Sequence, residues 1–200
     1  MLYKELLSFI AIILTIFAYF PYIHSILKGK TSPHLFTWII WGSATIVIFL
    51  AQLKDGGGIG TWSTGISGCI ALYVALLAYI KRADSSIDKL DYLFFSLSIL
   101  ALLAWYFTDN PLWAVIILTL TELLAFTPTF RKSYSQPLSE PLHFYILIVI
   151  RNIFAMIALE HYSITTLFFP AVSALACLSF TLMVYYRRNA ISESASNNES

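Results

Sequence analysis

Seven long apolar segments, separated by short polar stops, are the feature of this sequence that most constrains its fold. They cover residues 6–27, 33–53, 60–80, 90–108, 111–130, 141–159 and 163–186. An α-helix needs about 20 apolar residues to cross the hydrocarbon core of a bilayer. The composition agrees, because 58% of the residues are hydrophobic and only 12% are charged, against about 25% charged in a soluble domain. We therefore predict an all-α membrane protein with seven transmembrane helices and the lipid bilayer as a partner.

Lysine and arginine are distributed unevenly between the two ends of these predicted helices. Nine of them fall at one end, and only Lys4 and Lys54 fall at the other. Basic residues concentrate on the cytoplasmic side of membrane proteins, so we predict an N-terminus outside and a C-terminus inside. The first apolar segment is too long for the core of a cleavable signal peptide, and we count it as a span. Short loops around a bare seven-helix core make a bacterial inner (plasma) membrane the expected location.

Each half of the sequence contains a similar arrangement of prolines. A proline near the end of one predicted helix precedes a basic turn, and a second proline then opens the next helix. These are Pro21 and Pro33 in the first half, and Pro128 and Pro141 in the second. The repeat predicts two parallel three-helix bundles joined by a linker helix (3+1+3), an arrangement found among transporters. The predicted parts are a first bundle at 1–82, the linker helix at 83–109, a second bundle at 110–188 and a disordered tail at 189–200.

The 3+1+3 order, the outside N-terminus and the paired prolines resemble the PQ-loop and SWEET superfamily of small seven-helix transporters. The resemblance covers nearly the whole chain and implies transport by alternating access, with the four prolines as hinges. The sequence departs from the family at the glutamine that follows each motif proline, which is Tyr22 in the first copy and Thr129 in the second. Helices three and seven also lack the asparagine that sugar-carrying members use, so the resemblance does not single out a sugar.

Elementary chemistry gives these prolines a role without the family. Pro21 and Pro128 lie within predicted helices, where the ring removes a backbone hydrogen bond and crowds the preceding turn. The result is either a hinge or a static kink. For Pro33 and Pro141 the alternative to a hinge is the favourable first position of a helix.

Two charged residues, Glu122 and Arg151, fall in the middle of the fifth and sixth spans. A charge at this depth costs about 2.5–3.5 kcal/mol on the insertion scale, so such residues should be paired or line a wet cavity. From the rise of a helix, Glu122 lies about 16 Å and Arg151 about 13 Å from the same membrane boundary. We therefore predict an ion pair. It is either a structural staple assisted by Asn152, or a substrate and proton site.

Small residues along one face of the third span place that helix at the centre of its bundle. Polar residues of the third and seventh spans then become pocket candidates, and two tryptophans of the second span either line the pocket or pack. These candidates are Ser67, Tyr73, Ser173, Thr166, Trp38 and Trp41. No histidines or cysteines have the spacing of metal ligands, and neither a metal nor another cofactor is expected.

The leading hypothesis is a carrier that moves a small polar solute, such as a sugar, amino acid, nucleoside or vitamin, by alternating access. Protons are a further partner if Glu122 titrates; otherwise the carrier is a uniporter. The alternative is a receptor on the same scaffold that binds without transporting. An enzyme is not expected, because the sequence lacks hydrolase and metallopeptidase motifs. With a net charge of +1 and no basic block, nucleic acid is not an expected partner either, whereas a homo-oligomer stays open.

Overall fold

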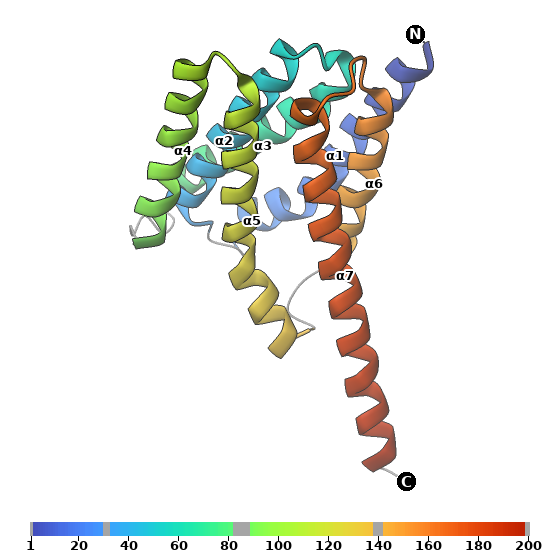
Figure 1. The fold of residues 1–200 in the computed structure, drawn as a ribbon. Coiled ribbons are helices and arrows are strands. Elements are labelled where there is room, and N and C mark those ends of the chain that lie inside the picture. The colour runs from blue at the N-terminus through green and yellow to red at the C-terminus, as the bar shows by residue number, and fades with distance from the viewer. Residues whose placement is uncertain (1, 30–32, 82–88, 138–141, 199–200) are drawn as a thin grey trace.

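The computed structural model describes residues 2–29, 33–81, 89–137 and 142–198, and the secondary structure within these ranges is helical (Figure 1). The elements are α1 (Leu2–Leu27), α2 (Leu35–Lys54), the 3₁₀ turn η1 (Gly58–Thr61), α3 (Trp62–Ile80), α4 (Lys89–Thr108), α5 (Pro111–Ser135), α6 (Leu142–Ala158) and α7 (Ile164–Asn198). Five of the helices (α1, α2, α3, α5 and α7) are long and apolar enough to cross a membrane, while α4 and α6 hold shorter apolar stretches. The prediction of an all-α membrane protein is confirmed.

Several helix ends differ from the predicted ones. The side chain of His34 caps α2 by accepting a hydrogen bond from the backbone N–H of Thr37. Pro33 therefore precedes the cap and does not take the first helical position, while Pro141 lies outside the described residues. Helix α5 continues past the predicted end at residue 130 to Ser135.

Helix α7 extends well beyond the predicted membrane span, and Figure 1 shows its end projecting from the bundle. The sequence predicts a disordered tail over residues 189–200, whereas α7 continues as a helix to Asn198. The segment contains no glycine or proline that would stop a helix. Its serine and asparagine content therefore did not predict where the helix ends.

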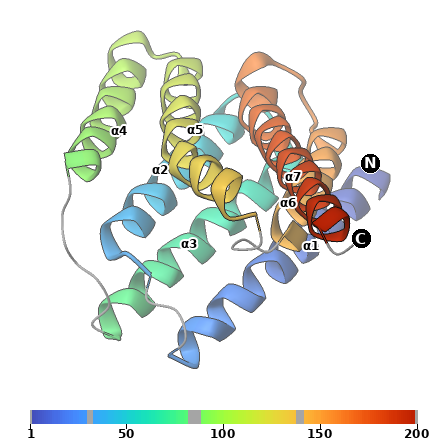
Figure 2. The same ribbon diagram turned by 90° about the horizontal axis from the view of Figure 1, so that it is seen from below.

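The order in which the helices pack differs from their order in the chain. Helix α3 contacts both α1 and α2, and helix α7 contacts both α5 and α6. Helix α1 also packs against α6, and α2 packs against α5. Helix α4 contacts α5 and α2 and lies at the edge of the bundle in Figure 2. Helices α2 and α3, and α6 and α7, follow each other in the chain and pack closely, whereas α1 and α2, and α5 and α6, are not main packing partners.

Three groups of buried side chains hold these helices together, and the smallest joins α1 and α3 around Ile26 and Val74. A second joins α2, α4, α5 and α7 around Ile48, Leu118 and Phe169. The third joins α1, α6 and α7 around Phe180 and Tyr145, whose ring centroids are 4.2 Å apart. Fully burying an aromatic or large aliphatic side chain contributes about 1.5–3 kcal/mol when it leaves water. Outside these groups the helices expose many large apolar side chains, as a lipid-facing surface requires.

Candidate functional site

Polar side chains from six of the seven helices lie near one another within the bundle, joined by hydrogen bonds or within electrostatic range. We call this group the central cluster; its members are Tyr19 of α1, Thr45 of α2, Ser67 of α3, Glu122 of α5, Arg151 of α6 and Cys177 of α7. The sequence separates these residues widely, and the helix packing brings them together. Such a convergence of polar groups inside a membrane protein is a candidate functional site.

Two hydrogen bonds hold part of the central cluster in place. The hydroxyl groups of Tyr19 and Ser67 are 3.1 Å apart, which ties α1 to α3. The hydroxyl of Thr45 donates to the Glu122 carboxylate at 3.1 Å, which ties α2 to α5. These bonds fix the orientations of the Tyr19 phenol and the Glu122 carboxylate.

The predicted ion pair between Glu122 and Arg151 is not formed. Both residues are described, and no ion pair within 4.0 Å joins them, although they are close enough to interact electrostatically. The reason is the packing order, because α5 packs mainly against α2, α4 and α7, and α6 packs mainly against α1 and α7. The predicted pair depended on the assumption that helices adjacent in the chain are adjacent in space.

Arg151 is consequently a buried cation without a direct partner. It is 2% exposed, and its Nε and Nη1 atoms have no hydrogen-bond partner in the described part of the chain. The neighbouring Asn152 is fully buried, and both polar atoms of its amide group also lack a hydrogen bond there. In a folded protein the large majority of such groups are satisfied, so these two residues need an explanation.

Aromatic rings of α2 and α6 pack around Tyr19, the α1 member of the central cluster. The ring of Tyr19 lies 6.4 Å from that of Trp38 and 5.6 Å from that of Phe144. Trp38 also contacts Trp41 at 5.7 Å, so the two predicted tryptophans pack in one aromatic chain. The Trp41 Nε1 atom is buried and has no acceptor among the described residues.

The structure separates the remaining predicted pocket residues from this group. Tyr73 is 45% exposed, so it points away from the bundle interior and is not a pocket residue. Thr166 is fully buried, but it lies at the start of α7, where its hydroxyl donates to the His161 carbonyl. Ser173 is partly buried on α7. Of the six polar and aromatic candidates, Ser67 belongs to the central cluster, and Trp38 and Trp41 lie beside it.

Sequence reasoning missed Tyr19, Thr45 and Cys177 as members of the cluster. Threonine and tyrosine are common in membrane helices, and nothing in their spacing marked these two. A signal was available for Gln52, whose amide lies within a predicted span. Its Nε2 donates to the backbone carbonyl of Thr166 at 3.0 Å and so ties α2 to α7.

A second polar group lies at the end of the bundle that also holds the N-terminus (Figure 1). Here residues 55–61, between α2 and α3, meet residues 159–163, between α6 and α7; we call these two segments the clasp. The Ser163 hydroxyl donates to the Asp55 carboxylate, and His161 Nδ1 donates to the Asp55 carbonyl at 2.9 Å. The Glu160 N–H donates to the Gly57 carbonyl at 3.1 Å.

Glycine permits the close approach of the two segments of the clasp. A Cβ atom on Gly60 would lie 2.5 Å from the backbone nitrogen of Leu159, a distance that real Cβ atoms essentially never show. Gly58 has a φ of +61° and lies against the Glu160 side chain, whose carboxylate accepts a hydrogen bond from the Ile59 N–H at 3.4 Å. Only a residue without a side chain fits both positions.

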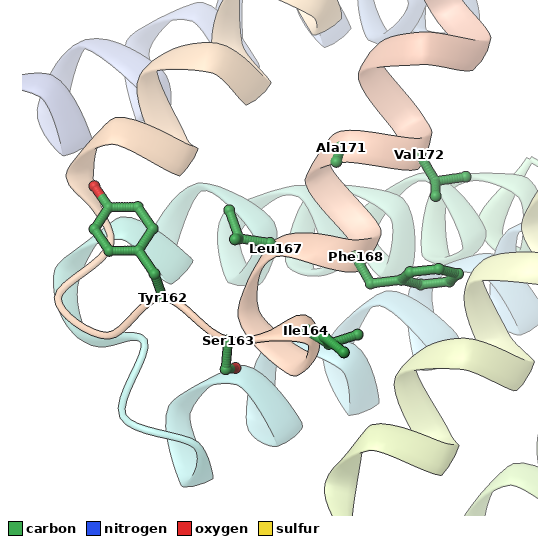
Figure 3. A pocket seen from close by; sticks show the side chains of 7 residues that line it. All are labelled: Tyr162, Ser163, Ile164, Leu167, Phe168, Ala171 and Val172. Atoms are coloured by element: carbon green, nitrogen blue, oxygen red, sulfur yellow. The ribbon is translucent and has the colours of Figure 1, made fainter.

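An open depression of about 430 Å³ lies beside the clasp, on residues between Tyr162 and Val172 (Figure 3). Its lining is mostly apolar, with Leu167 and Phe168 among the side chains that face it. None of its lining residues belongs to the central cluster, and none is charged. It is therefore a poor candidate for binding a polar solute.

Comparisons of the sequence with protein-family models, and of the chain with curated proteins and solved structures, found no significant match.

Proposed function

We propose that this protein is a membrane carrier that moves a small polar solute by alternating access between two three-helix bundles. The observation that carries the proposal is the central cluster, in which one polar side chain comes from each of six helices and none from α4. A site built between two bundles can be exposed to either side of the membrane when the bundles rock against each other.

The packing pattern supports the 3+1+3 arrangement. In the first bundle α3 packs between α1 and α2, and in the second α7 packs between α5 and α6. Between the bundles, α1 contacts α6 and α2 contacts α5. A rotation that places α1 on α5 and α2 on α6 converts the first of these contacts into the second. This is the pattern expected of parallel repeats related by an axis along the membrane normal, with α4 as the linker on the periphery.

The orientation follows from charge. Lys28 and Lys81 lie at the helix ends opposite the clasp, as do Arg131, Arg187 and Arg188, whereas Lys54 lies at the clasp end. The bias in lysine and arginine places the clasp outside and the C-terminus in the cytoplasm. For a chain with such short connections, we place it in a bacterial inner membrane.

The clasp would be the outer gate. It connects the α2–α3 segment of one bundle to the α6–α7 segment of the other, so its hydrogen bonds must break for the site to open outward. This structure would then represent a state closed to the outside. Pro21 within α1 and Pro128 within α5 would be the hinges, because each removes a backbone hydrogen bond from its helix.

The test is uptake into proteoliposomes that contain the purified protein. Radiolabelled monosaccharides, amino acids, carboxylic acids, nucleosides and vitamins are compared with protein-free liposomes, and binding of each is measured by thermal shift in detergent. A carrier equilibrates at least one class faster than the control. Binding of a class without its uptake would instead establish the receptor alternative.

Locking the clasp tests the gating part of the proposal. Asp55→Cys and Ser163→Cys are combined in a background without Cys69 and Cys177, after that background has been shown to transport. Oxidation should abolish uptake and dithiothreitol should restore it, because the locked bundles cannot exchange states. Either single-cysteine variant is the matched control and should keep its uptake under oxidation. Uptake that persists in the oxidised double variant would show that the clasp is not the gate.

A further inference from the structure

The central cluster also carries information on what it binds, and this information lies in its unsatisfied groups. The buried atoms without partners beside the aromatic chain are mainly donors: Nε and Nη1 of Arg151 and Nε1 of Trp41. A guanidinium and an indole can donate hydrogen bonds but accept none. The complement of such a surface is a group rich in acceptors and negatively charged.

Arg151 adds geometry to this charge. A guanidinium presents its N–H groups in a planar fork, and a carboxylate accepts two of them in parallel. The Nε and Nη1 donors of Arg151 are not used within the described part of the chain, and Glu122 is instead engaged by Thr45. The guanidinium is therefore held at the centre of the bundle, among Tyr19 and Cys177, without the internal partner that usually neutralises it.

We propose that the solute carried by this protein bears a carboxylate, which Arg151 binds between the two bundles, with Asn152 and Trp41 as additional positioning residues. That the solute is transported rests on the proposed function, whereas the binding of a carboxylate by Arg151 does not. A phosphate group is disfavoured because a second negative charge would meet Glu122 without a second cation. A sugar is disfavoured because its hydroxyl groups gain nothing specific from a buried positive charge.

Two kinds of carboxylate share this chemistry. A simple carboxylic acid would engage Arg151 alone, whereas an amino acid would also place its ammonium group near the Glu122 carboxylate. The two side chains are not ion-paired, so both remain available to opposite ends of one solute. A matched set of three-carbon probes separates these cases: propionate, alanine, alaninamide and propionamide carry, in turn, the acid alone, both charges, the ammonium alone and neither.

The experiment is a thermal-shift titration of the full chain in detergent, with these probes and their phenyl-substituted analogues up to tens of millimolar. We expect the acids to raise the melting temperature and the amides not to do so. If alanine and propionate raise the melting temperature equally, the ligand is a simple carboxylic acid. If only alanine raises it, the ligand is a zwitterion. If acids and amides change the melting temperature equally, or if no probe changes it, the inference is overturned.

Variants of Arg151 distinguish specific binding of the acids from a general effect of salt on the stability of the protein. Arg151→Gln should weaken acid binding by tenfold or more, and Arg151→Lys should weaken it less, because lysine keeps the charge and loses the fork. Arg187→Gln is the matched control, since Arg187 is only partly buried and bonds to the Tyr134 carbonyl far along α7. A response that survives Arg151→Gln in folded protein also overturns the inference.

Uptake of the same probes separates this inference from the carrier proposal. Selective acid binding without entry into proteoliposomes would uphold the carboxylate site and reject transport. Entry of a neutral solute, with acids and amides binding equally, would uphold transport and reject the carboxylate site.

Discussion

The clasp and the central cluster are both polar groups inside a largely apolar molecule, but they differ in how their polar atoms are satisfied. In the clasp, the Asp55 carboxylate and carbonyl and the Glu160 N–H all have partners. At the central cluster, Arg151 and the adjacent Asn152 each hold two buried atoms without a partner in the described part of the chain. A buried polar atom left unpaired costs about 1–3 kcal/mol.

This difference separates residues that stabilise the observed conformation from residues that do not. The clasp residues hold the two proposed bundles together at one end. Arg151 and Asn152 make the bundle less stable than apolar side chains of the same shape would. Stability sacrificed at a particular site is typical of a functional site. The predictions below test that contrast, starting with the largest expected effect.

Gly60→Val should destabilise the protein most, by about 3 kcal/mol or more, because the new side chain would collide with the backbone. A Cβ atom at this position would lie 2.5 Å from the nitrogen of Leu159 and 2.7 Å from the carbonyl carbon of Ala158. The measurement is thermal unfolding in detergent. Gly29→Ala is the control, since Gly29 has a φ of +70° and a Cβ atom there would meet nothing within 4 Å. It should lose only about 1–2 kcal/mol from backbone strain, and equal losses in the two variants would contradict the close approach.

Arg151→Met should have the opposite effect on stability. Removing a buried charge without a partner should leave the free energy of unfolding unchanged or raise it by up to about 3 kcal/mol. The melting temperature should be unchanged or higher. Binding of a carboxylate should be lost in the same variant. Arg187→Met is the comparison, because it removes a partly buried arginine that bonds to and stacks on Tyr134. A marked loss of stability in Arg151→Met would mean that Arg151 is a structural staple after all.

Asp55→Ala should lower stability by about 1.5–3 kcal/mol, the value of a hydrogen bond to a charged group. Ser163→Ala removes the other partner of the same bond. A double-mutant cycle measured by thermal unfolding should therefore be non-additive, with a coupling of about 0.5 kcal/mol or more. Additive effects would show that the two residues do not hold the clasp closed together.

Lys54→Gln should have the smallest effect. The exposed Lys54 ammonium, 2.5 Å from the Asp109 carboxylate, holds the pKa of that carboxyl below its usual range. A lowered pKa stabilises the folded state above the usual pKa of the group, and this contribution is lost as the pH falls through the lowered value. The melting temperatures of the two proteins should therefore differ slightly at about pH 6 and converge in strong acid. A difference that grows in acid would contradict the assignment.

Much of the secondary structure could be predicted from the sequence. Apolar length and polar stops placed all seven helices, with ends usually within a few residues, because each helix satisfies its own backbone in lipid. The predicted disordered tail after residue 188 differs from the helix that continues to Asn198, because composition alone does not end a helix. The predicted start of the second helix at Pro33 is also displaced, because the side chain of His34 caps α2.

The site was only partly predictable. Glu122, Arg151 and Asn152 stood out because polar residues are rare at that depth, and the small face of the third span suggested Ser67. Their partners depend on which helices touch, and that is a property of the whole bundle. Hence Thr45, and not Arg151, bonds to Glu122, and Tyr73 points outward. Neither outcome has a local signal in the sequence.

The glycines of the clasp have a thermal consequence. Four of the seven residues from Asp55 to Thr61 are glycines, and glycine loses more conformational freedom than any other residue when it is ordered. Closing this segment is therefore opposed by an unusually large loss of chain entropy, which the hydrogen bonds to residues 159–163 must offset. Warming favours the side of an equilibrium with the higher entropy. Any opening of the clasp should accordingly become easier as the temperature rises, which would make the protein's turnover steeply dependent on the warmth of its surroundings.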